Sequence, residues 1–248
     1  MRAANRLVAQ VLEALESAVA PGVTTAELDA AAERMVRDGG AVPAFKGYRG
    51  FPATLCTSVN AQVVHGIPSP TVVLVDGDIV SIDIGVKLDG FYGDSAVTVP
   101  VGVVPTRTQE LLKVTRESLE RGIAEVRVGG RLSDVSHAVQ KWVEAHEFSV
   151  VREFVGHGIG EQLHEEPPIP NFGQPGRGPK LAVGMVLAIE PMVAMGRSEV
   201  RVLGDGWTAV TKDGSLAAHF EHTVAVSEDG PLILTARTVS AGVVAAAR

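Results

Sequence analysis

The spacing of the apolar residues predicts helices at the start of the chain. Over residues 7–19, apolar side chains recur every three or four positions, as on one face of an α-helix, and Pro21 ends the pattern. Thr24 and Glu27 have the spacing of a capping box, which predicts the start of a second helix. Gly39 follows the last apolar position of this helix, so we expect the helix to end there.

The rest of the chain continues with strands and then repeats this order. Strand-like patterns extend over about 54–104, helical patterns over about 109–126 and 132–147, and strand-like patterns again over about 149–235. The order of helices, strands, helices and strands favours the α+β class, with helices packed on a largely antiparallel sheet.

Two halves of the sequence are similar at an offset of 107 residues. The apolar positions of residues 28–36 fall on those of 135–143, and residues 77–83 fall on 184–190. Any two amphipathic helices can be aligned, but the second match is in the same register. In both copies a glycine precedes an apolar strand that ends in a carboxylate. We therefore expect a single domain over 1–248, with two pseudo-symmetric halves, about 1–105 and 106–248, that share one sheet and one site.

Composition and charge narrow the class of protein. Of the 248 residues, 46% are hydrophobic and 21% are charged, which is typical of a globular domain. The net charge of -7 argues against a nucleic-acid surface, because phosphate binding relies on clustered Lys and Arg. Cys56 is the only cysteine, and the sequence has neither a secretory signal nor an apolar run long enough to span a membrane. We therefore expect a cytoplasmic protein that binds no nucleic acid and no membrane.

Two acidic residues lie on a predicted hairpin. Asp83 lies in an apolar strand-like run, Asp94 lies in the next one, and Asp89-Gly90 between them has the composition of a tight turn. With a two-residue turn, the two acids lie on one face, opposite or diagonal to each other. Buried carboxylates at that separation repel each other unless one is protonated or a cation is bound. The alternative is a solvent-exposed face, but the intervening strand positions are apolar.

Further candidate residues lie in the second half. His157 is flanked by glycines, which give the backbone the freedom to direct a side chain into a site, and His164 follows shortly after it. Glu190 ends an apolar strand next to a proline, and Glu221 lies within another predicted strand. Each residue alone is compatible with a structural role, but unpaired buried acids are costly.

Together these residues have the composition of a site for two divalent cations. Bridging carboxylates and one imidazole suit Mn(II), Fe(II) or Co(II), with Zn(II) as an alternative. Paired ions lower the pKa of a shared water and polarise a carbonyl group, so this set of residues predicts hydrolysis. A single-metal or redox site is the alternative, but it would need fewer ligands than the sequence offers. The candidate ligands are Asp83, Asp94, His157, Glu190 and Glu221, whereas His137 and His146 lie in a helical pattern and are interpreted as surface residues.

The motifs of the chain, taken in order, resemble those of the type I methionine aminopeptidases. The resemblance extends across both halves and implies the pita-bread fold of that family, in its short bacterial form. The motifs are Gly47-Tyr48-Arg49-Gly50-Phe51-Pro52, His65-Gly66-Ile67-Pro68, Asp78-Ile79-Val80-Ser81-Ile82-Asp83, Asp89-Gly90-Phe91-Tyr92-Gly93-Asp94, Gly156-His157-Gly158-Ile159-Gly160, His164-Glu165-Glu166-Pro167, Ile189-Glu190-Pro191-Met192, Asp205-Gly206-Trp207-Thr208 and Glu221-His222-Thr223.

The resemblance implies how the ligands divide between two metal ions. Asp83 would bind the first ion through both oxygens, and Asp94 and Glu221 would bridge to the second. His157 and Glu190 would complete the ligands of the second ion, and Glu190 would also be the general base.

The resemblance also implies the substrate contacts. His164 would donate a hydrogen bond to the scissile carbonyl oxygen, and His65 would contact the substrate near the leaving amide nitrogen. Phe45 and Leu163 depart from the bacterial pattern, which has Cys and Phe at these positions, and both would line the pocket or its entrance. The pocket for the methionine side chain would involve Tyr48, Phe51, Cys56 and Trp207.

The resemblance therefore implies removal of the initiator methionine from nascent polypeptides whose second residue is small. The partners would be nascent N-termini, met at the ribosome or away from it, and we expect a monomer. Aminopeptidase P and prolidase share the fold and the ligands but prefer proline after the cleaved bond, and the segments around Tyr48, His65 and Trp207 favour the methionine branch. A metal-free binding module of this fold is the other alternative, and it would be expected to lack ligands that are all present here.

Overall fold

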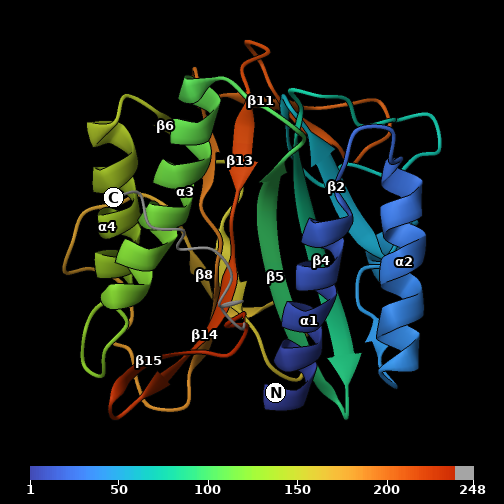
Figure 1. Ribbon diagram of the computed structural model, residues 1–248. Coiled ribbons are helices and arrows are strands. Elements are labelled where there is room, and N and C mark those ends of the chain that lie inside the picture. The colour runs from blue at the N-terminus through green and yellow to red at the C-terminus, as the bar shows by residue number, and fades with distance from the viewer. Residues whose placement is uncertain (238–248) are drawn as a thin grey trace, which may run out of the picture.

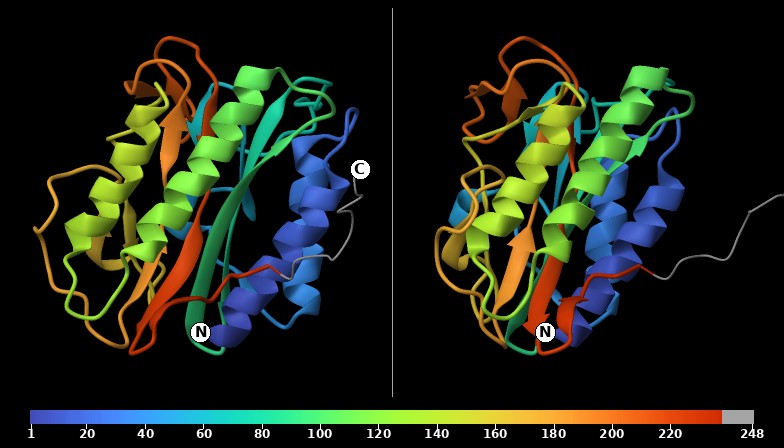
Figure 2. Two further views of the ribbon diagram at one scale, coloured as in Figure 1. Left: turned by 60° about the vertical axis from the view of Figure 1, so that its left-hand side comes forward. Right: turned by 90° about the vertical axis from the view of Figure 1, so that its left-hand side faces the viewer.

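The computed structural model describes residues 1–237, and its helices form two pairs with the strands between them (Figure 1). Helices α1 (Arg2–Ala18) and α2 (Thr25–Asp38) belong to the first half. Helices α3 (Thr106–Ala124) and α4 (Leu132–Ala145) belong to the second half and lie side by side in both views of Figure 2. The predicted order of elements is confirmed, although α3 begins three residues before the expected position.

The strands pair only in the antiparallel sense within the described residues. The first half contributes β1 (Val42–Pro43), β2 (Leu55–Val59), β3 (Gln62–Val64), β4 (Ile79–Leu88) and β5 (Phe91–Pro100), together with the 3-10 helix η1 (Tyr48–Gly50). The second half contributes β6 (Ser149–Val150), β7 (Gly156–Gly158), β8 (Glu165–Ile169), β9 (Val186–Ile189), β10 (Met192–Ala194), β11 (Val200–Val202), β12 (Ala209–Thr211), β13 (Ala217–His219), β14 (His222–Ser227) and β15 (Gly230–Ile233).

Four small sheets result from this pairing. In the largest of the first half, β1 and β2 pair with successive parts of one edge of β4, and β5 pairs with the other edge along the whole of β4. The largest of the second half has the order β15-β14-β9-β7-β8, and two three-stranded sheets, β13-β10-β6 and β11-β12-β3, complete the structure. The α+β class with a largely antiparallel sheet is confirmed.

The amphipathic face of α1 shows how the helices are held on the sheet. Val8, Val11, Leu12 and Leu15 are at most 1% exposed and belong to one apolar cluster with strands β4 and β5. Complete burial of a side chain of this size contributes about 1.5–3 kcal/mol. Helix α1 is therefore held by apolar packing against β4 and β5, the strands that carry Asp83 and Asp94.

The 107-residue offset recurs in the structure. Adding 107 to the bounds of α2, 25 and 38, gives 132 and 145, which are the bounds of α4. An isolated bridge joins Thr24 to Val73 in the first half, and the equivalent bridge, again shifted by 107, joins Arg131 to Lys180. Helices α2 and α4 and their connections to the strands therefore follow one plan. The division into halves at about residue 105 stays a prediction, and residues 238–248 of the expected domain lie outside the described residues.

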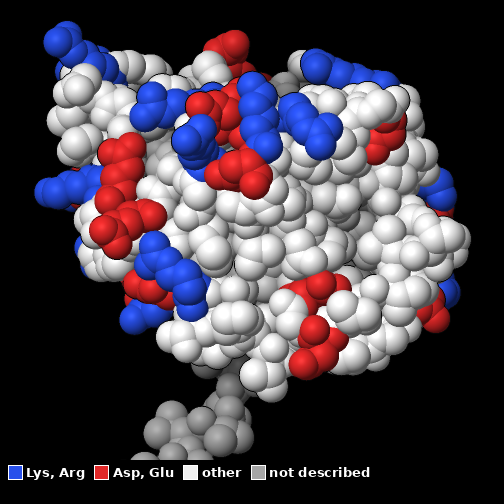
Figure 3. Space-filling model, turned by 90° about the horizontal axis from the view of Figure 1, so that it is seen from above, with Lys and Arg blue, Asp and Glu red and all other residues white. Residues whose placement is uncertain are grey.

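Two features of the surface bear on the partners that the protein could bind. Over residues 1–237, no helix is both long enough and apolar enough to cross a membrane. On the face seen from above in Figure 3, basic and acidic side chains lie beside one another. This face therefore presents no continuous basic area of the kind that phosphate backbones bind.

Candidate active site

The acidic hairpin of the first half has the predicted geometry. In the β4–β5 pairing, Asp83 lies opposite Ala96, which is two positions beyond Asp94, so the two acids are diagonal neighbours on one face. The turn residues Asp89 and Gly90 have φ angles of 51° and 85°, as the tight two-residue turn requires. Asp94 is only 4% exposed, so the alternative of two solvent-exposed acids is wrong.

The second half supplies a corresponding pair of acids. Strands β9 and β14 pair with Ile189 opposite His222, which places the adjoining residues Glu190 and Glu221 side by side. The prediction that Glu221 lies within a strand is wrong in detail, since this residue immediately precedes β14. His157 lies at the centre of β7, the strand on the other side of β9. All three side chains therefore come from adjacent positions of one sheet.

Hydrogen bonds between the halves hold the two pairs of acids together. The Thr223 hydroxyl donates to the Asp94 carbonyl oxygen at 2.7 Å and accepts from the Asp94 amide at 3.3 Å. The Glu221 amide donates to the carbonyl oxygen of Ala96 at 3.0 Å, and the Ser95 hydroxyl donates to the Glu221 carbonyl oxygen. The edges of β5 and β14 are thereby fixed to each other at the positions of the acids.

The candidate ligands converge. One ligand atom each from Asp94, His157 and Glu221 lies within 4.8 Å of the others. His157 Nε2 is 3.9 Å from Asp94 Oδ2 and 3.6 Å from Glu190 Oε1. His157 Nδ1 lies 2.9 Å from the Gly158 carbonyl oxygen, to which its N–H donates a hydrogen bond. In this tautomer Nε2 carries the lone pair, which is directed at the acids. Asp83 lines the same cavity, so all five predicted ligands are brought together.

The electrostatics of this cluster match a cation site. Burial raises the pKa of Asp83 to about 7 and that of Glu190 to about 7. Burial and the neighbouring acids raise the pKa of Asp94 and of Glu221 well above their ordinary values. Asp83 Oδ1, Asp94 Oδ1 and Glu221 Oε1 are buried without a hydrogen-bond partner. Such unsatisfied acceptors, on carboxylates that repel one another, are what divalent ions neutralise, so the donor set fits them.

The predicted substrate residues line the same cavity as the acids. The cavity volume is about 180 Å³, somewhat larger than the engineered cavity of about 150 Å³ that admits benzene. Its apolar wall includes the T-shaped pair Phe51 and Trp207, whose ring centroids are 5.1 Å apart. The remaining lining residues of the prediction are Phe45, Tyr48, Cys56, His65, Leu163 and His164, so every predicted pocket residue is in place.

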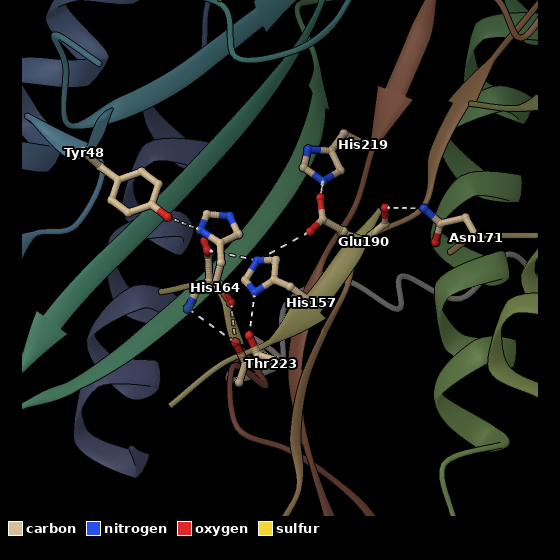
Figure 4. Close-up of polar contacts among 9 residues, drawn as sticks. Tyr48, His157, His164, Asn171, Glu190, His219 and Thr223 are labelled. Carbon is tan, nitrogen blue, oxygen red and sulfur yellow. Dashed lines mark hydrogen bonds and ion pairs between the residues drawn. The ribbon is translucent and has the colours of Figure 1, made fainter. Parts of the chain in front are cut away.

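Two histidines of the cavity are held by aromatic neighbours. His164 Nδ1 lies 3.0 Å from the Tyr48 hydroxyl, and the two rings are stacked at 5.3 Å (Figure 4). His65, with a positive φ of 60°, packs edge-on against Phe154 and Trp207. Burial lowers the pKa of His164 and that of His65 to about 4, so both imidazoles are neutral at neutral pH and retain a free acceptor or donor nitrogen.

The sequence reasoning missed one residue of the site, His219. Its side chain is almost fully buried at the end of β13, and its Nε2 lies 3.6 Å from Glu190 Oε2 (Figure 4). The only signal in the sequence was its position two residues before Glu221, which reads as an ordinary strand residue. Asn171, also not anticipated, donates its side-chain amide to the Glu190 carbonyl oxygen at 2.9 Å.

His137 and His146 take no part in the site. His137 contacts the Gly173 carbonyl oxygen and His146 that of Trp142, in both cases through Nδ1. Both are half-buried rather than fully exposed, because each rests against backbone or an aromatic ring next to α4. The prediction that they are surface residues is wrong in degree, because both are half-buried.

The fold and this cluster define a metallopeptidase, and comparison with known proteins identifies the family. The model of metallopeptidase family M24 matches residues 1–228, and the chain belongs to this family. It is 55% identical to methionine aminopeptidase 1 of Bacillus subtilis, over 95% of this chain and 94% of that protein.

Solved structures agree with this assignment. The methionine aminopeptidase of Thermotoga maritima matches with a TM-score of 0.94 and 48% identity, over 95% of this chain and 94% of that one. A prolidase from Pyrococcus furiosus matches with a TM-score of 0.74 but only 21% identity, over 96% of this chain and 63% of the prolidase chain. This match shows the shared fold alone. The resemblance to the bacterial type I methionine aminopeptidases is thus confirmed, as is the pita-bread fold.

Proposed function

We propose that the protein is a metal-dependent methionine aminopeptidase that releases the N-terminal methionine from polypeptides whose second residue is small. The observation that carries this proposal is the convergence, in one cavity, of five metal-ligand side chains with an apolar wall for a single side chain. The kinship with methionine aminopeptidases over 95% of the chain supports the same activity.

The site is proposed to hold two divalent ions. Asp83 would bind one, His157 and Glu190 the other, with Asp94 and Glu221 bridging. The number of carboxylate oxygens and the absence of a thiolate among these five residues favour Mn(II), Fe(II) or Co(II), with Zn(II) as the alternative. Bound ions would supply an activated water and a polarised carbonyl group.

The protein's own residues would move the protons and orient the substrate. Glu190 is proposed as the general base, because its carboxylate lines the cavity beside the other ligands and Oε1 lies 3.6 Å from His157 Nε2. His164 would donate a hydrogen bond to the scissile carbonyl oxygen, with Tyr48 holding its ring in place. His65, which packs beside Trp207, would contact the amide nitrogen that becomes the leaving group.

The selectivity is proposed to follow from the size of the cavity. Phe51, Cys56 and Trp207 would enclose the methionine side chain, and their apolar and sulfur-containing surfaces suit a thioether. The site would close tightly around the residue after the cleaved bond, so a small side chain would be required there. Nascent polypeptides in the cytoplasm, met at the ribosome or free of it, are the proposed partners, and the protein is proposed to act as a monomer.

A peptide assay on protein stripped with chelator tests this proposal. Mn(II) or Co(II) is restored, and release of the first residue is followed from Met-Ala-Ser and from Ala-Pro-Ser. We expect metal-dependent release from Met-Ala-Ser alone, and slower release as the second residue grows from Ala to Leu. Cleavage of Ala-Pro-Ser instead would assign the protein to the prolidase branch, and equal rates for Ala and Leu would contradict the size filter. Two bound ions without cleavage of either peptide would favour a binding role.

A further inference from the structure

We infer that His219 is a positioning residue that fixes the Glu190 carboxylate by donating the Nε2 proton to Glu190 Oε2. The inference rests on the proposed function, in which Glu190 acts as both ligand and base. It concerns a residue that none of the sequence motifs includes.

The geometry of His219 is that of a group aimed at one acceptor. The side chain is 2% exposed, and Nε2 has no hydrogen-bond partner in the described part of the chain. Glu190 Oε2 lies 3.6 Å away, so an approach of about half an ångström would bring the two atoms into hydrogen-bond range. A buried donor without a partner costs free energy, which favours that approach.

The backbone of His219 is held firmly enough to direct the ring. The Thr98 hydroxyl accepts from the His219 amide at 2.8 Å and lies 2.8 Å from the His219 carbonyl oxygen, to which it donates. Thr98 belongs to β5 of the first half, whereas His219 ends β13 of the second. One hydroxyl from the opposite half therefore fixes the peptide group that carries the imidazole.

The two oxygens of Glu190 face different groups. Oε1 lies 3.6 Å from His157 Nε2, on the side of the ligand cluster, and Oε2 faces His219 (Figure 4). The Asn171 amide fixes the backbone of the same residue from behind. With Oε2 held by His219, the carboxylate cannot rotate, and Oε1 stays directed at the other ligands. Partners that orient a metal-ligating group in this way typically change metal affinity or activity 10–100-fold when they are removed.

The proposed role of His219 needs an N–H donor at the position of Nε2 and no charge. Uncharged variants that differ only in whether and where they carry such a donor therefore test it. His219→Gln places an amide nitrogen near the position of Nε2, whereas His219→Asn places one near the position of Nδ1. His219→Leu fills the space without a donor. His146→Leu, at a half-buried histidine outside the site, controls for the loss of an imidazole elsewhere.

Each variant is titrated with Mn(II) by calorimetry, the visible spectrum of the Co(II)-loaded protein is recorded, and kcat and KM are measured with Met-Ala-Ser. We expect His219→Leu and His219→Asn to lose about 10–100-fold in kcat or in affinity for the more weakly bound ion. KM should stay within about twofold, because the pocket walls are unchanged, and His219→Gln should restore both the affinity and the spectrum.

The inference is overturned if His219→Leu keeps wild-type metal affinity and kcat, or if Gln and Asn are equally impaired. If His219→Leu fails to fold, the comparison of Gln with Asn decides the matter. The metal titration and the spectrum do not depend on the substrate. Wild-type protein that fails to cleave Met-Ala-Ser would therefore refute the proposed function and leave the test of His219 intact.

Discussion

Metal-free protein should become less stable as the pH rises from 5 to 7. Ionisation of the four buried acids becomes favourable in the unfolded chain, whereas in the folded protein no cation is present to neutralise the carboxylates. The perturbation is removal of metal ions with chelator, followed by unfolding at a series of pH values. In most proteins the free energy of unfolding does not fall over this range. Their paired carboxylates have lowered pKa values in the folded state and are already ionised, so they destabilise the fold only at more acid pH.

The magnitude follows from the raised pKa values. Glu190 has a pKa of about 7 in the folded protein against 4.5 for an ordinary glutamate. A group whose folded pKa is raised stabilises the fold fully below its unfolded pKa, and this stability is lost as the pH rises through the folded value. Each such group changes the free energy of unfolding by about 1.4 kcal/mol per pH unit within that window, or about 3 kcal/mol in total for Glu190. Asp83, also raised to about 7, acts in the same direction. Losses of this size are a large part of the 5–15 kcal/mol that holds a typical domain together.

Urea unfolding followed by circular dichroism between pH 5 and pH 8 measures the effect. Metal-free protein should lose stability up to about pH 7, and excess Mn(II) should restore it, by about 4 kcal/mol at a thousand times the dissociation constant. Asp83→Asn removes one ionisable group and should flatten the pH dependence of the metal-free protein. A metal-free stability that is constant or rises between pH 5 and 7, with Asp83→Asn identical to the wild type, would refute the reasoning.

Three further predictions concern single residues. Glu190→Gln should lower kcat for Met-Ala-Ser by about 10²–10⁴-fold, as loss of a general base does, and circular dichroism should show an unchanged fold. His164→Leu removes the donor to the carbonyl oxygen and should lower kcat by about 10²–10³-fold, with calorimetric Mn(II) affinity kept because His164 is not among the proposed ligands; a normal kcat would exclude this role. Thr223→Val leaves the Asp94 carbonyl oxygen and amide without the hydroxyl that they contact in the other half. Urea unfolding should therefore show a free energy of unfolding lower by about 1–3 kcal/mol. A decrease below about 0.5 kcal/mol, the size of a neutral surface change, would contradict a stabilising hydrogen bond between the halves.

The parts of the fold with local signals were predictable from the sequence. The capping box of Thr24 and Glu27 is formed as expected, with hydrogen bonds of 3.2 Å from the Glu27 amide and 2.8 Å from the Thr24 amide. The turn at Asp89-Gly90 fixed the register of its hairpin, and therefore the diagonal placement of Asp83 and Asp94. In these cases the residues that set the geometry lie within short segments, 24–27 for the capping box and 83–94 for the hairpin.

The parts that depend on contacts between residues distant in the sequence were not predictable. His219 approaches Glu190 only because β13 and β10 pair with His219 opposite Met192, and short strands of three residues give no periodic signal. The Thr223 hydroxyl reaches Asp94 over 129 residues of sequence. Phe45 fills the space above Gly85, where a Cβ atom would lie 2.6 Å from its ring. This close fit of side chain to backbone also follows from tertiary packing rather than from any local pattern.

The 107-residue repeat bears on how the site distinguishes the two ends of a peptide. The two-fold relation between Asp83 and Glu190, on equivalent strands of the two halves, has by itself no preferred direction, whereas a peptide runs from amino to carboxyl end. His157 and His164 come from the second half alone, because 107 residues earlier the chain has Gly50 and Thr57. Only groups that occur once can sense polarity. The equivalent acids Asp83 and Glu190 would therefore supply charge from both halves, and the imidazoles without a counterpart would distinguish the amino end of the peptide from its carboxyl end.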